Sequence, residues 1–189
     1  MTAEPALRQN MTADEFFAWA ETWEDTERYE LIDGVPVRMQ AEKISHAERK
    51  ASAWLALRTA LQSAGLADCR AFPDGVSVRV GERTVREPDA VVHCGPYDAD
   101  KMFAPNPIVV VEILSPSTAR TDFERKLIDY FAVPSMLHYL IVLGDEGRVI
   151  HHRRRSAETV IETIILGREA VIDLSPPGFS VTVEELLTA

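Results

Sequence analysis

The run Ile108-Val-Val-Val-Glu-Ile-Leu114 constrains the fold more than any other segment of the chain. Six of its seven side chains are aliphatic and most are β-branched, which favours a strand. A nearly continuous apolar run is typical of a strand that is buried on both faces of its sheet. The run therefore predicts a layered α/β (α+β) fold, with a mixed central β-sheet flanked by helices.

The rest of the chain fits one such layered domain. It has 189 residues, of which 46% are hydrophobic and 26% charged, the balance of an ordinary globular protein. No repeat or linker divides it, so we expect a loose N-terminal arm over 1–10 and a single domain over 11–189. No apolar stretch is long enough to cross a membrane, and Cys69 and Cys94 lack metal-ligand spacing. A cytoplasmic location is expected.

Local patterns predict the elements of the N-terminal half. Thr12-Ala-Asp-Glu15 is a capping box that opens a helix. Residues 28–39 predict a hairpin, because Asp33-Gly34 favours the positive dihedral angles of a tight turn. A second capping box, Ser45-His-Ala-Glu48, predicts a helix that ends at Gly65. The residues of this helix that are expected to pack inward are Ala47, Ala51, Trp54, Leu55 and Leu61.

In the C-terminal half, Thr121-Asp-Phe-Glu124 is a third capping box and predicts a helix to about Ala132. Residues 137–143 and 148–153 predict a second hairpin. Four arginines and two histidines fall within residues 148–155, in a chain whose net charge is -10. This basic segment is typical of an edge strand protected by charge, although it could also help a largely acidic protein to contact nucleic acid.

Glu112 interrupts the apolar run and needs an explanation. If the strand is central, its carboxylate is desolvated, at a cost of several kcal/mol unless a cation or a positive side chain lies nearby. If the strand lies at an edge, Glu112 could face solvent. Val110 and Leu114 share its face of the strand, which favours burial.

Lys126 is a second polar residue in an apolar pattern. It falls between Phe123 and Tyr130 on the face of the predicted helix that packs against the sheet. Its ammonium either extends to the rim of the protein or reaches the carboxylates that need neutralising. By contrast, Arg125 and Asp129 have the spacing of an ordinary surface pair.

Two Pro-Asp pairs precede the apolar run and have different contexts. Phe72-Pro-Asp-Gly75 is a turn sequence, so Asp74 is interpreted as a turn residue without chemistry. Pro88-Asp89 leads directly into Ala-Val-Val-His93, and proline is tolerated at the first residue of a strand. Asp89 is therefore expected to open a strand.

Asp89, Glu112 and Lys126 together favour one chemistry. Mg²⁺ is usually bound by one or two carboxylates with waters and a substrate phosphate, and a neighbouring ammonium can orient the attacking water. No Gly-rich phosphate loop, nucleophile elbow or His-Glu-x-x-His zinc motif is present. Phosphodiester hydrolysis is the reaction class that these residues serve best.

The order of these motifs resembles the PD-(D/E)xK nuclease superfamily and, within it, the Uma-type family of restriction endonucleases. Pro88-Asp89 and Glu112, separated by 22 residues, carry the superfamily pattern. The wider resemblance runs from about Met11 to Leu187. Its further motifs are Met11-Thr-Ala-Asp-Glu-Phe16, Arg28-Tyr-Glu-Leu-Ile-Asp-Gly34, Val110-Val-Glu-Ile-Leu-Ser-Pro-Ser-Thr118, and Asp122 with Lys126 and Tyr130.

The resemblance implies a restriction-endonuclease-like core and a role for each matching residue. Asp89 and Glu112 would hold Mg²⁺ or Mn²⁺, with Glu30 as a third acid of the pocket. Lys126 would be the catalytic lysine, moved to a helix from its usual place, which holds Leu114 here. His46 would contact substrate phosphate, unless it is simply a histidine at a helix end. Glu30 could likewise be a solvent-facing residue of the hairpin.

The resulting hypothesis is a metal-dependent endonuclease that hydrolyses phosphodiester bonds in DNA and leaves a 5′-phosphate. A homodimer is expected, since symmetric dimers suit enzymes that cut two strands. The alternative is a catalytically inactive nuclease-like module for binding or assembly, which the displaced lysine favours. A phosphatase or an RNase on the same metal site also stays open, because the acids do not specify the substrate.

Overall fold

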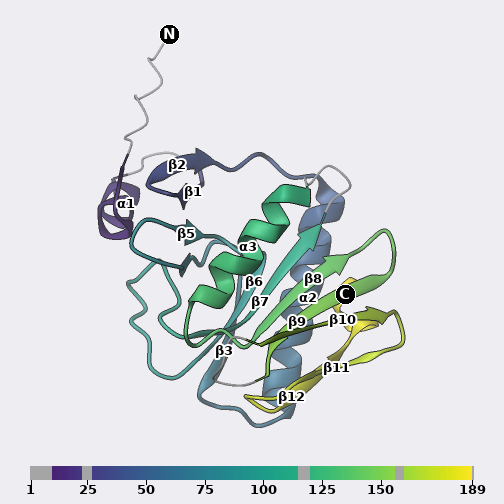
Figure 1. The fold of residues 1–189 in the computed structure, drawn as a ribbon. Coiled ribbons are helices and arrows are strands. Elements are labelled where there is room, and N and C mark those ends of the chain that lie inside the picture. Colours follow the sequence, from purple (N-terminus) through teal and green to yellow (C-terminus); the bar gives the residue numbers. More distant parts are fainter. Residues whose placement is uncertain (1–9, 23–26, 115–119, 156–159, 189) are drawn as a thin grey trace.

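The computed structural model describes residues 10–22, 27–114, 120–155 and 160–188. A six-stranded sheet forms its centre (Figure 1). The strand order is β10 (Ile161–Gly167), β9 (Arg148–Arg154), β8 (His138–Leu143), β7 (Pro107–Leu114), β6 (Ala90–Cys94) and β3 (Cys69–Pro73). β7 and β8 are parallel and the other neighbours are antiparallel. The prediction of a mixed sheet with the apolar run in its interior is confirmed.

Helices cover both faces of this sheet. α2 (Ile44–Ser63) and α4 (Val183–Leu187) pack on one face with the hairpin of β11 (Val171–Leu174) and β12 (Phe179–Thr182), and α3 (Arg120–Ala132) crosses the other (Figure 1). Side chains alternate along β7. Val109, Val111 and Ile113 lie in the hydrophobic core between the sheet and α2 (the α2 core), and Val110 lies in the core between the sheet and α3 (the α3 core). Glu112 therefore points towards α3.

A smaller sheet carries the N-terminal hairpin. Its order is β2 (Val35–Arg38), β1 (Tyr29–Ile32), β5 (Val85–Arg86) and β4 (Val78–Arg79). The predicted hairpin turn is confirmed, with φ of 50° at Asp33 and 82° at Gly34. The Thr12 capping box is also confirmed, at the start of α1 (Ala13–Ala20).

The prediction for α2 is wrong in its start and in part of its inward face, since only Leu61 and Trp54 of the predicted residues pack on the core. The helix begins at Ile44, and its N-cap, Lys43, makes no side-chain cap hydrogen bond. The residues that α2 buries are Lys50, Ser52, Ala53, Leu57 and Leu61, whereas Ala47, Ala51 and Leu55 are exposed. Ala53, Leu57 and Leu61 recur every four residues and set the contact stripe. The sequence pattern could not place Lys50 on that stripe, because a lysine is buried only when acids are brought to it.

Two further expectations for the C-terminal half are corrected. α3 already begins at Arg120, so Thr121 lies inside the helix and not at its N-cap. The basic segment is β9, which lies between β8 and β10 and is therefore not an edge strand. His151 and His152 in this strand are buried. Arginines at its end are held by neighbours, since Arg153 pairs with Glu162 on β10.

Cys69 and Cys94 lie opposite each other in β3 and β6 and form a disulfide. Disulfides persist mainly in oxidising compartments, so this pair gives no support to the expected cytoplasmic location, which stays a prediction. Over the described ranges, none of the helices has the length and apolar character that crossing a membrane requires.

Candidate active site

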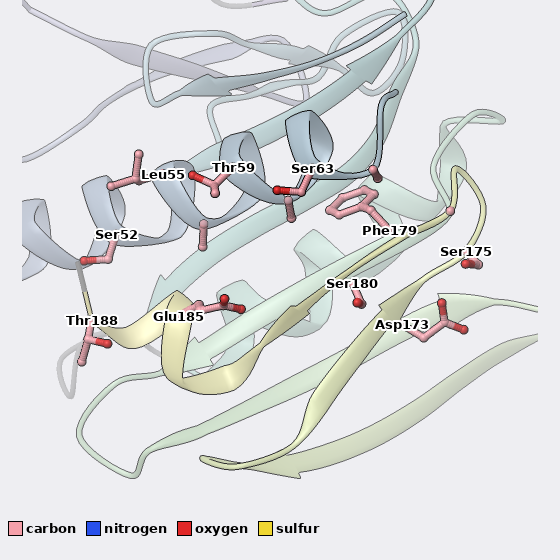
Figure 2. A pocket seen from close by; sticks show the side chains of 14 residues that line it. Ser52, Leu55, Thr59, Ser63, Asp173, Ser175, Phe179, Ser180, Glu185 and Thr188 are labelled. Carbon is pink, nitrogen blue, oxygen red and sulfur yellow. The ribbon is translucent and has the colours of Figure 1, made fainter. Parts of the chain in front are cut away.

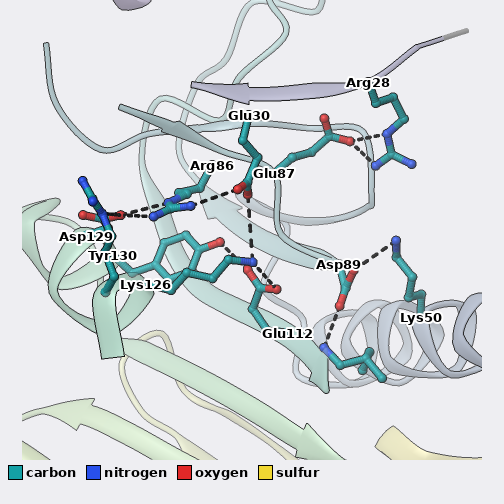
Figure 3. A network of polar contacts seen from close by, with 12 residues as sticks. Arg28, Glu30, Lys50, Arg86, Glu87, Asp89, Glu112, Lys126, Asp129 and Tyr130 are labelled. Carbon is teal, nitrogen blue, oxygen red and sulfur yellow. Dashed lines mark hydrogen bonds and ion pairs between the residues drawn. The ribbon is translucent and has the colours of Figure 1, made fainter. Parts of the chain in front are cut away.

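Asp89 lies one residue before β6, so it precedes the strand that it was expected to open, and it lies beside Glu112 because β6 and β7 are paired. Ala90 is opposite Val111 across β6 and β7, and the Asp89 N–H donates to the Val111 carbonyl at 3.1 Å. The Asp89 side chain turns back onto β7, where Oδ2 accepts the Ile113 N–H at 2.6 Å (Figure 3). This bond fixes the Asp89 carboxylate beside the residue that follows Glu112.

Lys126 reaches Glu112 from α3. Its Nζ lies 2.9 Å from Glu112 Oε2, and the Tyr130 hydroxyl, one helical turn later, donates to Oε1 at 2.6 Å (Figure 3). Only 14% of the Lys126 side chain is exposed, so its ammonium turns to the acids and not to the rim of the protein. Leu114, in the usual place of the lysine, packs against the α3 core.

Glu30 also enters this cluster, and both of its oxygens are held. Oε2 accepts from Arg86 at 2.9 Å, and Oε1 accepts the Glu87 N–H at 3.0 Å. The Lys126 Nζ is more distant, at 3.9 Å from Oε1. The Arg86 guanidinium, whose side chain is 0% exposed, also binds Asp129 at 2.6 Å. Asp129 is thus part of a buried network, and the predicted pair with Arg125 is present only at 3.9 Å.

Lys50 of α2 binds the other side of Asp89. Its Nζ lies 3.0 Å from Asp89 Oδ1, 3.0 Å from Asp74 Oδ2 and 2.6 Å from Glu42 Oε1. Arg28 joins this group through Asp74, at 2.8 Å, and through Glu87. Asp74 does lie at the predicted turn after β3, but the expectation that it stands apart from the site is wrong, because its carboxylate reaches Lys50.

The pKa values of the two central acids move in opposite directions. Burial raises the pKa of Glu112 to about 7, against the attraction of Lys126, and repulsion from Asp89 and Glu30 adds to the rise. Burial also tends to raise the pKa of Asp89, but His46, Lys50 and the Ile113 N–H outweigh it, and the pKa falls below its usual value. Adjacent acids with diverging pKa values are typical of catalytic sites.

A cleft of about 740 Å³ opens onto these groups. Its walls include Glu30, Asp89, Glu112 and Lys126 together with His46. The His46 Nε2 lies 3.8 Å from Asp89 Oδ2, and one ligand atom from each of Glu42, His46 and Asp89 falls within 4.8 Å of the others. The predicted site residues, which lie far apart in the sequence, are therefore brought together in one cleft.

The cluster retains negative charge that suits a hard divalent cation. Over the ranges that the structure describes, its ion pairs of 3.0 Å or less join four cations to seven carboxylates, which leaves three negative charges when all are ionised. The cations are Arg28, Lys50, Arg86 and Lys126, and the acids are Glu30, Glu42, Asp74, Glu87, Asp89, Glu112 and Asp129. Carboxylate oxygens are the donors that Mg²⁺ prefers, so the donor set fits that ion.

Sequence reasoning missed Lys50, Arg86 and Tyr130 as members of the site. Arg86 gave no signal, because alternation with the apolar Val85 would place it on the outer face of a half-buried strand, whereas both residues are buried. Tyr130 was assigned to the apolar face of its helix, where its ring does lie in the α3 core. Lys50 gave no signal, because its three acids come from three separate loops.

A second cavity, of about 690 Å³, lies between α2 and β12 with α4 (Figure 2). Small polar side chains line much of it, among them Ser52, Thr59, Ser63 and Ser180. It contains none of the residues of the acidic cluster. We assign it no role.

Comparisons with known proteins agree with this fold. The Uma2 family model, described as "Putative restriction endonuclease", matches residues 13–184. A crystal structure from Anabaena variabilis ATCC 29413, described as "a putative nuclease belonging to DUF820", is similar with a TM-score of 0.70 and 17% identity, over 94% of this chain and 97% of that one. This likeness shows a shared fold. Among curated proteins, none matches the chain.

Proposed function

Because the chain belongs to the Uma2 family, we propose that it is a metal-dependent endonuclease that hydrolyses phosphodiester bonds in DNA, with Mg²⁺ or Mn²⁺ as its cofactor. One observation carries the proposal. Two buried carboxylates, Asp89 and Glu112, meet a largely buried lysine, Lys126, in a cleft with residual negative charge.

Each residue has a defined part in the proposed reaction. Asp89 and Glu112 hold the cation, and Glu30 supports it by its charge. When bound, the cation supplies a Lewis acid and lowers the pKa of a water. Lys126 either orients the attacking water and offsets the phosphate charge as an ammonium, or deprotonates that water as a neutral amine, and His46 contacts a phosphate oxygen.

The acidic surface limits how the protein can hold DNA. Its net charge of -10 opposes binding to a polyanion. The basic segment of β9 offers little compensation, because Arg155 pairs with Glu162 and Arg154 donates to the Phe131 carbonyl. We therefore expect weak affinity for duplexes that falls with added salt, and a homodimer that presents two sites to two strands.

The first prediction tests the activity itself. With Mg²⁺ or Mn²⁺, the purified protein is expected to nick supercoiled plasmid, and Asp89→Ala or Lys126→Ala is expected to lower the rate at least about a hundredfold. Agarose electrophoresis measures nicking, and Glu169→Gln, an exposed and distant acid, is the matched control.

The competing candidate is the inactive binding module, which Leu114 in place of the usual lysine favours. No cleavage of DNA or RNA by folded wild-type protein with either metal would support that module. If the protein cleaved RNA but not DNA, the proposed active site would stand and the proposed substrate would change from DNA to RNA.

A further inference from the structure

Lys50 is the cationic side chain that contacts Asp89 most closely among the described residues, yet the proposed reaction gives it no part. Its side chain is 4% exposed, and its three partners are all carboxylates, at 2.6 to 3.0 Å. An ammonium has three donors, so Glu42, Asp74 and Asp89 satisfy all of them. Three carboxylates at these distances neutralise the buried ammonium.

The two oxygens of Asp89 are used differently. Oδ2 accepts the Ile113 N–H at 2.6 Å and is thereby fixed to β7. Oδ1 lies 3.0 Å from Lys50 Nζ. A divalent cation that approaches Asp89 therefore approaches an oxygen that already has a positive partner, and the two positive charges repel each other.

Lys50 keeps two other carboxylate partners when a cation binds Asp89. Glu42 and Asp74 together hold two of its three donors, and neither belongs to the proposed metal ligands. Lys126 is placed differently, because its contact at 2.9 Å is with Glu112, which is itself a proposed metal ligand. If Lys50 loses its contact with Asp89, Glu42 and Asp74 therefore still neutralise its buried ammonium.

We propose that Lys50 is the internal counter-ion of Asp89. In the metal-free protein the Lys50 ammonium contacts Asp89 Oδ1. When a divalent cation binds, the ammonium leaves this oxygen to the cation and stays bound to Glu42 and Asp74. This role rests on the proposed function, because it assigns the metal to Asp89. Lys50 thus keeps the acidic cluster folded without metal and sets how tightly the metal binds. It is a positioning residue for the acid and not a group that acts on the substrate.

Calorimetric titration of metal-free protein with Mn²⁺ tests the proposal. Lys50→Met keeps the length of the side chain and removes its charge. We expect this variant to bind Mn²⁺ roughly tenfold more tightly, or more, than wild type, because a repelling charge is gone. Its melting temperature in EDTA is expected to fall. Lys101→Met, on an exposed residue outside the lining of the cleft, is the control and should change the affinity less than about twofold.

A second variant guards against loss of folding. Lys50→Met with Asp74→Asn removes one charge of each sign, and should also bind Mn²⁺ more tightly than wild type if its circular dichroism is native. Unchanged or weaker binding in whichever variant folds would overturn the role of Lys50. If the variants give that result while wild type cuts DNA and binds Mn²⁺, the inference on Lys50 fails and the nuclease proposal stands. If nothing is cut but Lys50→Met tightens binding, the nuclease proposal fails and the counter-ion role stands. Binding by no variant overturns both.

Discussion

Arg86 is the clearest case of a single residue on which the site depends. Its guanidinium is fully buried and lies between Glu30 at 2.9 Å and Asp129 at 2.6 Å. Through these bonds it links the small sheet to α3, where Lys126 also lies. Removing one partner of a buried ion network leaves the others uncompensated, which costs more than the pair contributes.

We predict that Arg86→Met lowers the free energy of unfolding by about 3–5 kcal/mol, because two buried carboxylates lose their cation. Urea denaturation followed by tryptophan fluorescence measures the change. Arg83→Met, on an exposed arginine in the turn before β5, is the control and should stay within about 0.5 kcal/mol of wild type. A loss for Arg86→Met that is no larger than the control's would contradict the burial of this network.

Residues of the site differ in how far the sequence could predict them. Glu112 and Lys126 stood out because each is a charge in a locally apolar pattern, and pattern is a local property. Arg86 and Lys50 lack such contrast, since their neighbours are mixed and their partners are remote in sequence. A buried cation is explained only by the acids around it, and these are known only when the chain is folded.

At the scale of elements, β8 and β9 carry a pair of buried histidines. His138 Nε2 donates to the Pro176 carbonyl at 2.8 Å, so its Nδ1 accepts from His151 Nε2 at 2.9 Å when both rings are neutral. Burial lowers the pKa of His151 to about 3, and it also lowers the pKa of His138. Both rings are therefore held neutral near pH 7, and their mutual hydrogen bond is lost when both become protonated.

The contribution of His151 to the stability of the protein is predicted to fall in mild acid. In the unfolded chain His151 binds a proton below about pH 6.5, whereas in the folded protein it does so only below about pH 3. Between these pH values the His151 contribution to the free energy of unfolding decreases as the pH falls. For this one group the slope approaches about 1.4 kcal/mol per pH unit. Urea denaturation from pH 7 to pH 4.5 should show a shallower slope for His151→Gln. An equal slope in both proteins would refute the assignment.

Elements were predictable where one local rule decided them. The Asp33-Gly34 turn and the Thr12 capping box follow from backbone chemistry, and both are found. The face of α2 depends on what the helix meets. Its alanines allow several contact stripes, and the α2 core and the acids around Lys50 select one of them.

For the molecule as a whole, the residual charge of the acidic cluster predicts stabilisation by divalent cations. A cation that binds only the folded state at a hundred times its Kd raises the free energy of unfolding by about 2.7 kcal/mol. Mg²⁺ or Mn²⁺ should therefore raise the melting temperature, and EDTA should reverse the effect.

Scanning calorimetry with matched variants locates this effect. Asp89→Asn and Glu112→Gln are expected to lose most of the metal-induced shift in melting temperature, whereas Glu169→Gln should retain it. The same shift in all four proteins would mean that the cation binds elsewhere.

The two halves of the site also differ in how much chain their contacts enclose. Lys126 and Glu112 are 14 residues apart, whereas Arg86 and Glu30 are 56 apart. Loop-closure entropy grows with the logarithm of length, so the longer loop costs about 1.2 kcal/mol more to close. In native-state hydrogen exchange, the amides of the N-terminal hairpin around Glu30 should consequently open more readily than those of β7. Glu112 and Lys126 would remain in contact while that hairpin opens.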